Sequence, residues 1–305
     1  MKKQDIKRIF TILIIGIYLI VNLINTSQST QVEEPIEVSE KTIEVMKPTI
    51  VSTELTIQYI DVGQAESILI SNNNRHMLID AGNNEDGPKL VAYLKSQGIE
   101  TLDYVVGTHP HEDHIGGLDE IINNFNINNI YLPEVYTTTK SFEDVLIAIE
   151  NKSLNITIPQ INEEISLGEA ILRVIYTGTD NEELNNSSII LKMMFGTTSY
   201  LFTGDTTSQI EQIILNSDID VDVLKVAHHG SEYSSTNEFL SKVTPSYAII
   251  SVGKNNDYSH PSPNVLNRIK TYTENIYRTD ELGTIILTSD GNYINITNMF
   301  TETNG

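Results

Sequence analysis

The feature that most constrains this chain is a run of six residues in which metal-binding side chains are concentrated. His109, His111 and His114 fall within it together with Glu112 and Asp113, although the whole chain has only seven histidines. The run follows an apolar, strand-like segment and opens a helical one. A loop that leaves a strand can direct alternate side chains toward different sides of a cavity, because strand side chains alternate in direction. The run therefore predicts a metal site.

The residue types also indicate which ions are suitable. Imidazole and carboxylate ligands together favour Zn²⁺, Mn²⁺ or iron over Ca²⁺, and we take Zn²⁺ as the first choice, with Mn²⁺ second. At this spacing His109 and His111 can hold one ion, while Asp113 and His114 hold another. The chain has no cysteine, which excludes disulfides, thiolate zinc sites and a cysteine nucleophile.

From about residue 50 onward, strand-like and helical periodicities alternate along the chain. Strands come first and then take turns with helices, which predicts two sheets covered by helices in one α/β domain. Strands are expected at 55–61, 67–70, 77–79, 104–108, 171–176, 189–195, 200–203, 221–227, 247–252, 284–288 and 293–297, and helices at 89–97, 115–125, 142–150, 209–215, 238–242 and 263–272.

The N-terminal segment, residues 1–25, predicts a membrane anchor. Its apolar run extends to about Ile24 and carries no charge after Arg8. A run of about 17–20 residues is near the minimum that crosses a ~30 Å hydrocarbon core. The basic flank predicts a cytoplasmic N-terminus and an extracellular domain. A cleaved signal peptide, which would make the protein secreted, is the alternative, and the lack of an A-x-A-like site after the run favours the anchor over it. A buried soluble helix is a third interpretation.

Composition divides the remainder into two parts. Residues 26–50 are rich in Ser, Thr, Gln, Glu and Pro and predict a disordered acidic stalk, and residues 51–300 form the predicted folded domain. The formal net charge is −22, from 19 Lys and Arg against 41 Asp and Glu, and the excess acid belongs to the domain. Such acidity argues against tight, sequence-independent binding of duplex DNA. It does not exclude phosphodiester cleavage, because bound metal ions can supply positive charge.

The H-x-H-x-D-H run resembles the signature of the metallo-β-lactamase superfamily, which has an αββα four-layer sandwich fold and a dinuclear metal site. The resemblance extends from about Leu55 to Ile296. It implies that Asp80 braces the metal loop by fixing a ligand imidazole, and that Asp205 bridges the two ions. The alternatives are purely structural roles: Asp80 would cap the end of a strand, and Asp205 would cap the helix that follows it.

Four shorter motifs resemble the hydrolase domain of the ComEC type of competence protein, which takes up DNA, and the third of them is also similar to phosphorylcholine esterases. They are Y-I-D-V-G-Q at 59–64, N-N-S-S at 185–188, K-V-A-H-H-G-S at 225–231 and S-H-P at 259–261.

The resemblance implies two ligand sets that share the bridging carboxylate. The first consists of His109, His111, Asp205 and water, because no histidine stands between His114 and Asp205, where many relatives have a third ligand. The second consists of Asp113, His114, Asp205 and one histidine of the 228/229 pair. We expect His229 to be that ligand and His228 to face the substrate.

Several further residues receive weaker assignments. Asp113 and His260 are expected to act catalytically, Asp113 by accepting a proton and His260 by hydrogen bonding to a phosphate or a leaving group. Asp61 is expected to be structural or to brace the metal loop together with Asp80. The expected substrate-binding residues are Asn186, Ser187 and Ser231.

Together these implications predict a metal-dependent hydrolase in which two divalent ions activate a hydroxide. Phosphodiesters are the expected substrates, with DNA or a nucleotide first. A phosphorylcholine-type esterase of the cell envelope is the alternative, and a non-catalytic binding module that keeps the fold is the competing class. The missing third histidine disfavours a β-lactamase, and the net charge disfavours a processive nuclease.

Overall fold

The structure, a computed structural model, describes residues 54–299. The predicted anchor at 1–25 and the predicted stalk at 26–50 lie outside the described residues. Among residues 54–299, no helix combines the length and the apolar character needed to cross a membrane.

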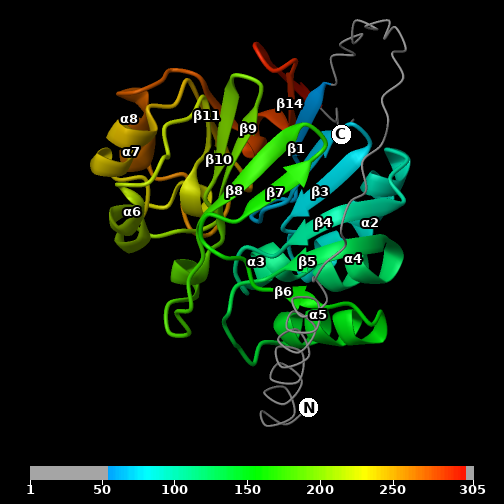
Figure 1. The fold of residues 1–305 in the computed structure, drawn as a ribbon. Helices are drawn as coiled ribbons and strands as arrows, with labels where there is room; N and C mark the ends of the chain where they lie inside the picture. The colour runs from blue at the N-terminus through cyan, green and yellow to red at the C-terminus, as the bar shows by residue number, and fades with distance from the viewer. Residues whose placement is uncertain (1–53, 300–305) are drawn as a thin grey trace, which may run out of the picture. The chain divides into compact units, whose positions relative to one another are not determined.

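Eight strands form the first sheet, in the order β15-β14-β1-β2-β3-β4-β5-β6 (Figure 1). Pairing is antiparallel from β15 to β3 and parallel from β3 to β6. The strands are β1 (Leu55–Tyr59), β2 (Ile68–Asn72), β3 (Arg75–Ile79), β4 (Thr101–Val106), β5 (Asn126–Tyr131), β6 (Ile156–Thr157), β14 (Thr284–Ser289) and β15 (Ile294–Met299).

Seven strands form the second sheet, in the order β13-β12-β11-β10-β9-β8-β7. Its pairing is parallel from β13 to β10 and antiparallel from β10 to β7. The strands are β7 (Glu164–Leu167), β8 (Ala170–Tyr176), β9 (Ile190–Phe195), β10 (Thr198–Phe202), β11 (Val223–Lys225), β12 (Tyr247–Ile250) and β13 (Ile276–Arg278).

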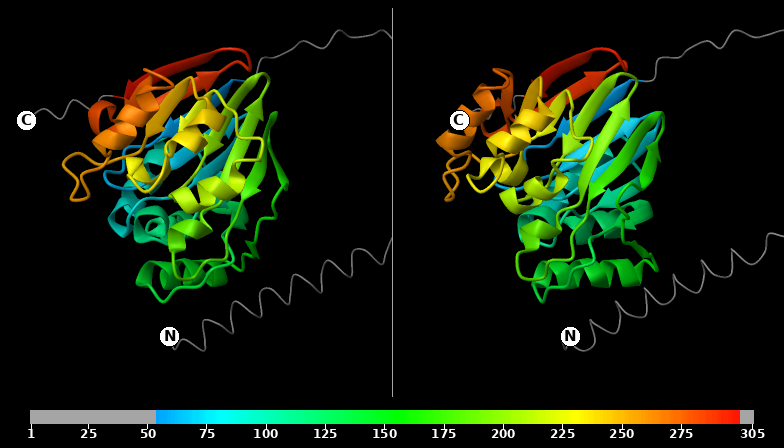
Figure 2. Two further views of the ribbon diagram at one scale, coloured as in Figure 1. Left: turned by 90° about the vertical axis from the view of Figure 1, so that its left-hand side faces the viewer. Right: turned by 60° about the vertical axis from the view of Figure 1, so that its left-hand side comes forward.

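Helices cover the outer face of each sheet. In both views of Figure 2 the teal and green helices stay with the first sheet, and the yellow and orange helices stay with the second. The first group is α2 (Gly87–Ser96), α3 (Glu112–Ile115), α4 (Leu118–Asn124) and α5 (Lys140–Asn151), and the second is α6 (Ser208–Ile214), α7 (Asn237–Val243) and α8 (Pro263–Lys270). Short helical turns are η1 (Asn84–Asp86), η2 (Leu184–Ser187), η3 (Ala227–Gly230) and α9 (Thr279–Leu282).

Apolar side chains between the layers hold them together. Strand side chains that point inward, such as Tyr59, Ile70 and Phe202, fill the space between the sheets. The outward side chains of the second sheet pack against α6, α7 and α8, through residues such as Phe239 and Val265. The predicted αββα four-layer sandwich is therefore confirmed.

The predicted helix at 115–125 is wrong in one respect, because it is broken into α3 and α4 at Gly116 and Gly117. A Cβ atom on Gly116 would lie 2.4 Å from the Asn84 nitrogen, and one on Gly117 would lie 2.4 Å from the Ala81 oxygen. The two glycines therefore allow the loop after β3 to lie directly against the loop after β4.

A buried ion pair joins the two halves of the sandwich. Glu66 follows β1 in the first sheet, Lys225 ends β11 in the second, and the Lys225 ammonium contacts the Glu66 carboxylate. Both side chains are completely buried. Burial of an unpaired charge costs several kcal/mol, so each charge depends on its partner. The Glu66 backbone N–H also donates to the Asp113 carbonyl at 3.0 Å, which connects the pair to the histidine-rich loop.

We predict that Lys225→Met destabilises the fold by about 3–5 kcal/mol, because it leaves the Glu66 charge buried and uncompensated. The free energy of urea unfolding measures this. Arg173→Met is the matched control, since the Arg173–Glu164 pair is half exposed and worth less than about 1 kcal/mol. Equal losses in the two variants would contradict the prediction.

Candidate metal centre

Loops that follow four strands supply the site at one edge of the sandwich. Asp80 follows β3, the 108–114 loop follows β4, Asp205 follows β10, and the 227–231 turn follows β11. Strands β3 and β4 are parallel neighbours, and so are β10 and β11. Because the carboxyl ends of parallel neighbours meet at one edge of a sheet, loops that are distant in sequence converge there.

Four of the predicted ligands form a compact cluster. The ligand atoms of Asp113, His114, Asp205 and His229 all lie within 4.8 Å of one another. His114 Nε2 is 3.3 Å from Asp205 Oδ1, and His229 Nε2 is 3.4 Å from both Asp205 Oδ2 and Asp113 Oδ2. Ligand atoms held at about 2.0–2.1 Å by a tetrahedral zinc ion are separated by roughly 3.3 Å, so the spacing suits such an ion.

Unsatisfied polar atoms point to the same conclusion. His114 Nε2, His229 Nε2 and Asp205 Oδ1 are buried and have no hydrogen-bond partner. Such atoms are rare in folded proteins and cost about 1–3 kcal/mol each. The opposite nitrogens are occupied: His114 Nδ1 lies 2.7 Å from Asp80 Oδ2, and His229 Nδ1 donates to the Ser251 carbonyl at 2.8 Å. The Nε2 atoms are thus the ring nitrogens directed at Asp205, and once unprotonated they can bind a divalent ion.

Asp80 fixes the position of the metal loop by hydrogen bonds to Thr108 and by its contact with His114. Its fully buried carboxylate accepts hydrogen bonds from the Thr108 N–H at 2.8 Å and the Thr108 hydroxyl at 2.7 Å, in addition to its contact with His114. Its φ of 58° is in the left-handed region, which Asp adopts more readily than most residues. One side chain therefore fixes both the position of the loop and the orientation of an imidazole.

A second pair of imidazoles lies beside the cluster. His109 Nε2 is 3.0 Å from His111 Nδ1, and the ring centroids of His109 and His114 are 4.2 Å apart. His109 is fully buried, whereas His111 lines a pocket open to solvent. The two rings are therefore placed to hold an ion next to the four-residue cluster.

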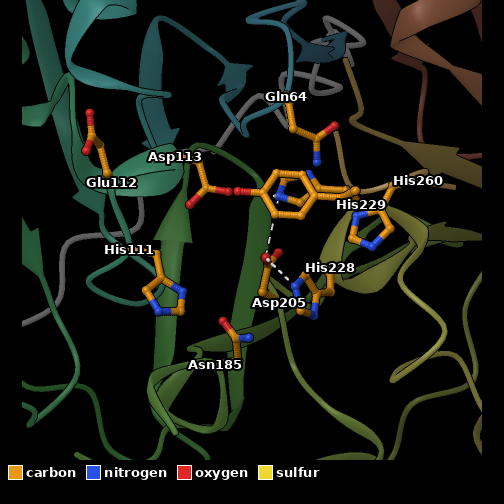
Figure 3. Close-up of a pocket in the computed structure, with 10 residues that line it drawn as sticks. Gln64, His111, Glu112, Asp113, Asn185, Asp205, His228, His229 and His260 are labelled. Carbon is orange, nitrogen blue, oxygen red and sulfur yellow. Dashed lines mark ion pairs between the residues drawn. The ribbon is translucent and has the colours of Figure 1, made fainter. Parts of the chain in front are cut away.

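A strained turn presents the histidine pair. His228 and His229 have φ values of 52° and 53°, a conformation that costs about 1–3 kcal/mol per residue. Gly230 continues the turn at φ 82°, where a Cβ atom would lie 2.5 Å from Pro261 Cβ. In this turn His229 is buried in the cluster, while His228 is partly exposed with its Nε2 3.8 Å from Asp205 Oδ2 (Figure 3).

The cluster is electrostatically matched to a cation. Burial disfavours charged imidazoles, but Asp205 and neighbouring carboxylates outweigh it, raising the pKa of His114 well above its usual value and that of His229 to about 9. Burial also disfavours ionised carboxylates, yet the two imidazoles hold the pKa values of Asp113 and Asp205 below their usual range. Without a metal the site keeps protons on its imidazoles, so a bound ion would replace them.

The centre opens into a pocket of about 290 Å³ (Figure 3). Its lining consists of Gln64, His111, Glu112, Asp113, Asn185, Asp205, His228, His229, Tyr258 and His260. The His260 ring lies 5.7 Å from the His228 ring, and partial burial together with His228 lowers the pKa of His260 to about 4. The predicted catalytic histidine therefore faces the pocket as a neutral imidazole at pH 7.

Asn186 and Ser187, which are predicted to bind substrate, are not among the residues that line the metal pocket. Asn186 Oδ1 accepts from the Thr207 hydroxyl at 2.6 Å, and the Ser187 hydroxyl donates to the Leu184 carbonyl at 2.6 Å, so both side chains serve the loop around η2. Asn185 lines the pocket instead, and its buried Oδ1 has no hydrogen-bond partner.

Two other predicted residues also lie away from the centre. Asp61 is exposed, and its carboxylate accepts from the Gly63 N–H at 3.1 Å, so it shapes the turn before Gln64 instead of bracing the metal loop. Ser231 is buried and lines a neighbouring pocket rather than the metal pocket.

Gln64 and Ser188 had no predicted role, yet both support the pocket. Gln64 Oε1 accepts from the Gly253 N–H at 3.0 Å, which ties the two sides of the pocket together. The Ser188 hydroxyl accepts from the Asp205 N–H at 3.2 Å and so positions that carboxylate. Both residues stand inside motifs that were identified, but amides and hydroxyls carry no metal signal of their own.

Comparison with known proteins places these motifs among relatives. The family model described as "Metallo-beta-lactamase superfamily" matches residues 60–254. The chain is 31% identical over 255 residues to ComE operon protein 3 of Bacillus subtilis, covering 77% of this chain and 33% of the relative. It is 28% identical over 238 residues to competence protein ComA of Neisseria gonorrhoeae (76% of this chain, 32% of the relative).

Recombination protein 2 of Haemophilus influenzae is 30% identical over 236 residues, covering 75% of this chain and 28% of the relative. The chain thus spans about a third of the length of these curated relatives. Among solved structures, the metallo-β-lactamase fold protein YhfI of Bacillus subtilis has a TM-score of 0.52 at 13% identity, covering 74% of this chain and 95% of that one. The diiron β-hydroxylase CmlA of Streptomyces venezuelae also has a TM-score of 0.52 at 13% identity, with coverages of 80% and 54%. Both structural likenesses concern the fold alone.

We predict that Asp80→Asn lowers the affinity for Zn²⁺ about 10- to 100-fold, because the amide no longer fixes the tautomer of His114. Isothermal titration calorimetry measures the change. Asp61→Asn is the matched control and should leave the affinity unaltered. The assignment of Asp80 fails if both variants bind as the unmodified chain does.

Metal affinity should also depend on pH. Because the pKa of His229 is raised to about 9, the metal-free imidazole is protonated at pH 7 and must lose its proton to bind an ion. The apparent affinity should therefore rise with pH between 6 and about 9, by ~10-fold per unit for each proton displaced. Calorimetry in buffers of different ionisation enthalpy counts the released protons, and an affinity independent of pH would contradict the prediction.

Proposed function

This chain belongs to the metallo-beta-lactamase superfamily, and we propose that it is a metal-dependent hydrolase of phosphodiesters with DNA or a nucleotide as its substrate. The observation that most supports this proposal is the convergence of unsatisfied ligand atoms from both sheets on one open pocket. Two divalent ions, Zn²⁺ first and Mn²⁺ second, fit this donor set.

The ligands divide between two ions by position. Asp113, His114, Asp205 and His229 would hold one ion. His109 and His111 would hold the other, with Asp205 shared. Bound ions of this kind would supply Lewis acidity and lower the pKa of water toward about 7.

The chain's own residues supply proton transfer and orientation. Asp113 is ionised, lines the pocket and is only partly covered, so it can accept a proton from water at the centre. His228 and His260 form the opposite wall and hydrogen bond to substrate oxygens as neutral imidazoles at pH 7. Asn185 contributes an amide on the remaining side.

Two considerations favour a phosphodiester over a β-lactam. This chain has no histidine between His114 and Asp205, where many members of the superfamily have a third ligand, and Asn185 lines the pocket. The relatives are named for competence and recombination, and the shorter motifs of this chain resemble those of a DNA-uptake protein. Attachment to a membrane through residues 1–25, with the domain outside the cell, remains part of the proposal.

The test uses the full chain in detergent, loaded with Zn²⁺ or Mn²⁺. We expect turnover of bis(p-nitrophenyl) phosphate and of single-stranded DNA, and none of a β-lactam. His109→Ala and Asp113→Ala should each lower kcat/KM at least about 100-fold, because they remove a metal ligand or the proton acceptor.

His76→Ala is the matched control, since His76 lies on β3 and hydrogen bonds Ser71 away from the pocket. If only a phosphorylcholine ester is turned over, the proposed substrate class is wrong and the phosphorylcholine-type esterase takes its place. If the protein binds no metal, the proposal of an enzyme is wrong and a non-catalytic binding module takes its place.

A further inference from the structure

The loop between β12 and α8 holds an aromatic side chain at the rim of the metal pocket. Tyr258 is 69% exposed, yet it lines the same pocket as Asp205 and His228. Its ring stacks on the His260 ring, with centroids 5.7 Å apart and planes inclined by 24°. We call this stacked pair of rings the platform, and it lies beside the place where the ions would lie.

A second pocket, of about 350 Å³, adjoins the metal pocket at this platform. Tyr258 and His260 line both pockets, so the two spaces adjoin. Tyr233, which is 68% exposed, lines the second pocket together with the hydroxyl-bearing Ser231. Its only charged lining residue among residues 54–299 is Glu232, which repels a phosphate but not an uncharged ring.

Hydrogen bonds hold the loop that carries Tyr258 in place. Asn256 Nδ2 donates to the carbonyls of Gly253 at 2.9 Å and His260 at 2.7 Å. Asn256 Oδ1 accepts from the N–H groups of Tyr258 at 3.1 Å and His260 at 3.0 Å. The aromatic ring is therefore presented by a loop that is already ordered, which reduces the entropy cost of binding a ligand.

We propose that Tyr258, with Tyr233 beyond it, is a stacking subsite for a base of a single-stranded nucleic acid whose phosphodiester occupies the metal pocket. The proposal rests on the proposed function. Bases of every kind stack on exposed aromatic rings, whereas the bases of a duplex are already stacked on each other. With a net charge of −22, the chain cannot gain affinity mainly by neutralising phosphates, so stacking and the metal centre must supply it.

A quaternary ammonium group is the rival occupant, because aromatic rings and a carboxylate attract such a cation. The nearly parallel rings of Tyr258 and His260 favour a flat ligand laid on a platform over a cation enclosed by rings.

The experiment compares a short oligothymidylate with an abasic strand of the same length, using the metal-loaded full chain. We expect Tyr258→Ala to raise KM for oligothymidylate about tenfold, to leave kcat unchanged and to leave the abasic strand unaffected. Tyr258→Phe should restore the KM, since the ring is retained. Tyr293→Ala is the matched control, because Tyr293 is also an exposed tyrosine, at 79%. It belongs to the β14–β15 turn, in which Gly291 contacts the β9–β10 turn. That turn lies at the end of β10 opposite Asp205, so Tyr293 is far from the metal pocket.

Each other outcome overturns a different statement. Equal cleavage of both strands, unaltered by Tyr258→Ala, would overturn the subsite and leave the proposed function intact. If neither strand is cleaved, the proposed function fails, and fluorescence anisotropy with the same strands then tests the stacking subsite. Equal affinities for the two strands would overturn the subsite. A higher affinity for oligothymidylate that is lost in Tyr258→Ala would support it. Turnover of p-nitrophenyl phosphorylcholine that is lost in Tyr258→Ala, with oligothymidylate unaffected, would assign the pocket to a cation.

Discussion

Burial of imidazole and carboxylate atoms without hydrogen-bond partners is the constraint on which this architecture depends. His114 Nε2, His229 Nε2 and Asp205 Oδ1 form no hydrogen bond in a dry interior, which is unfavourable unless protons or a metal ion lie between them. The neighbouring backbone is built to keep them there: a left-handed Asp80, two left-handed histidines and a pair of glycines packed against backbone. Such strain is tolerated because the surrounding layers over-determine it.

Much of the fold could be predicted from apolar periodicity, and the failures have local causes. Strand β5 has the sequence Asn-Ile-Asn-Asn-Ile-Tyr, and its asparagines, which are rare in strands, prevented its prediction. It forms a strand because parallel strands pair with it on both sides. Strands β6 and β13, of two and three residues, are too short to show a period. The break between α3 and α4 depends on the backbone of Ala81–Asn84, which is distant in sequence.

The candidate site was predictable where residue type alone carries the chemistry. Six residues contained three imidazoles and two acids, and no packing role explains that composition. Choices between neighbours were not predictable, because they depend on backbone direction. The turn η2 sends Asn185 to the pocket and Asn186 into the loop, and only the left-handed turn at 228–229 separates a buried imidazole from an exposed one. Tyr258 had no signal, since an exposed tyrosine in a polar loop is ordinary.

The donors of the centre are divided between the two sheets, and this division has a consequence for biosynthesis. His114 and Asp205 are 205 − 114 = 91 positions apart, and His229 comes later still. A nascent chain that has been made only as far as His114 therefore lacks two of the four clustered ligands. Strand β1 also waits for β14, which is made after all of these donors, before it gains its second neighbour. A metal ion at this centre would thus be captured only after synthesis has passed His229.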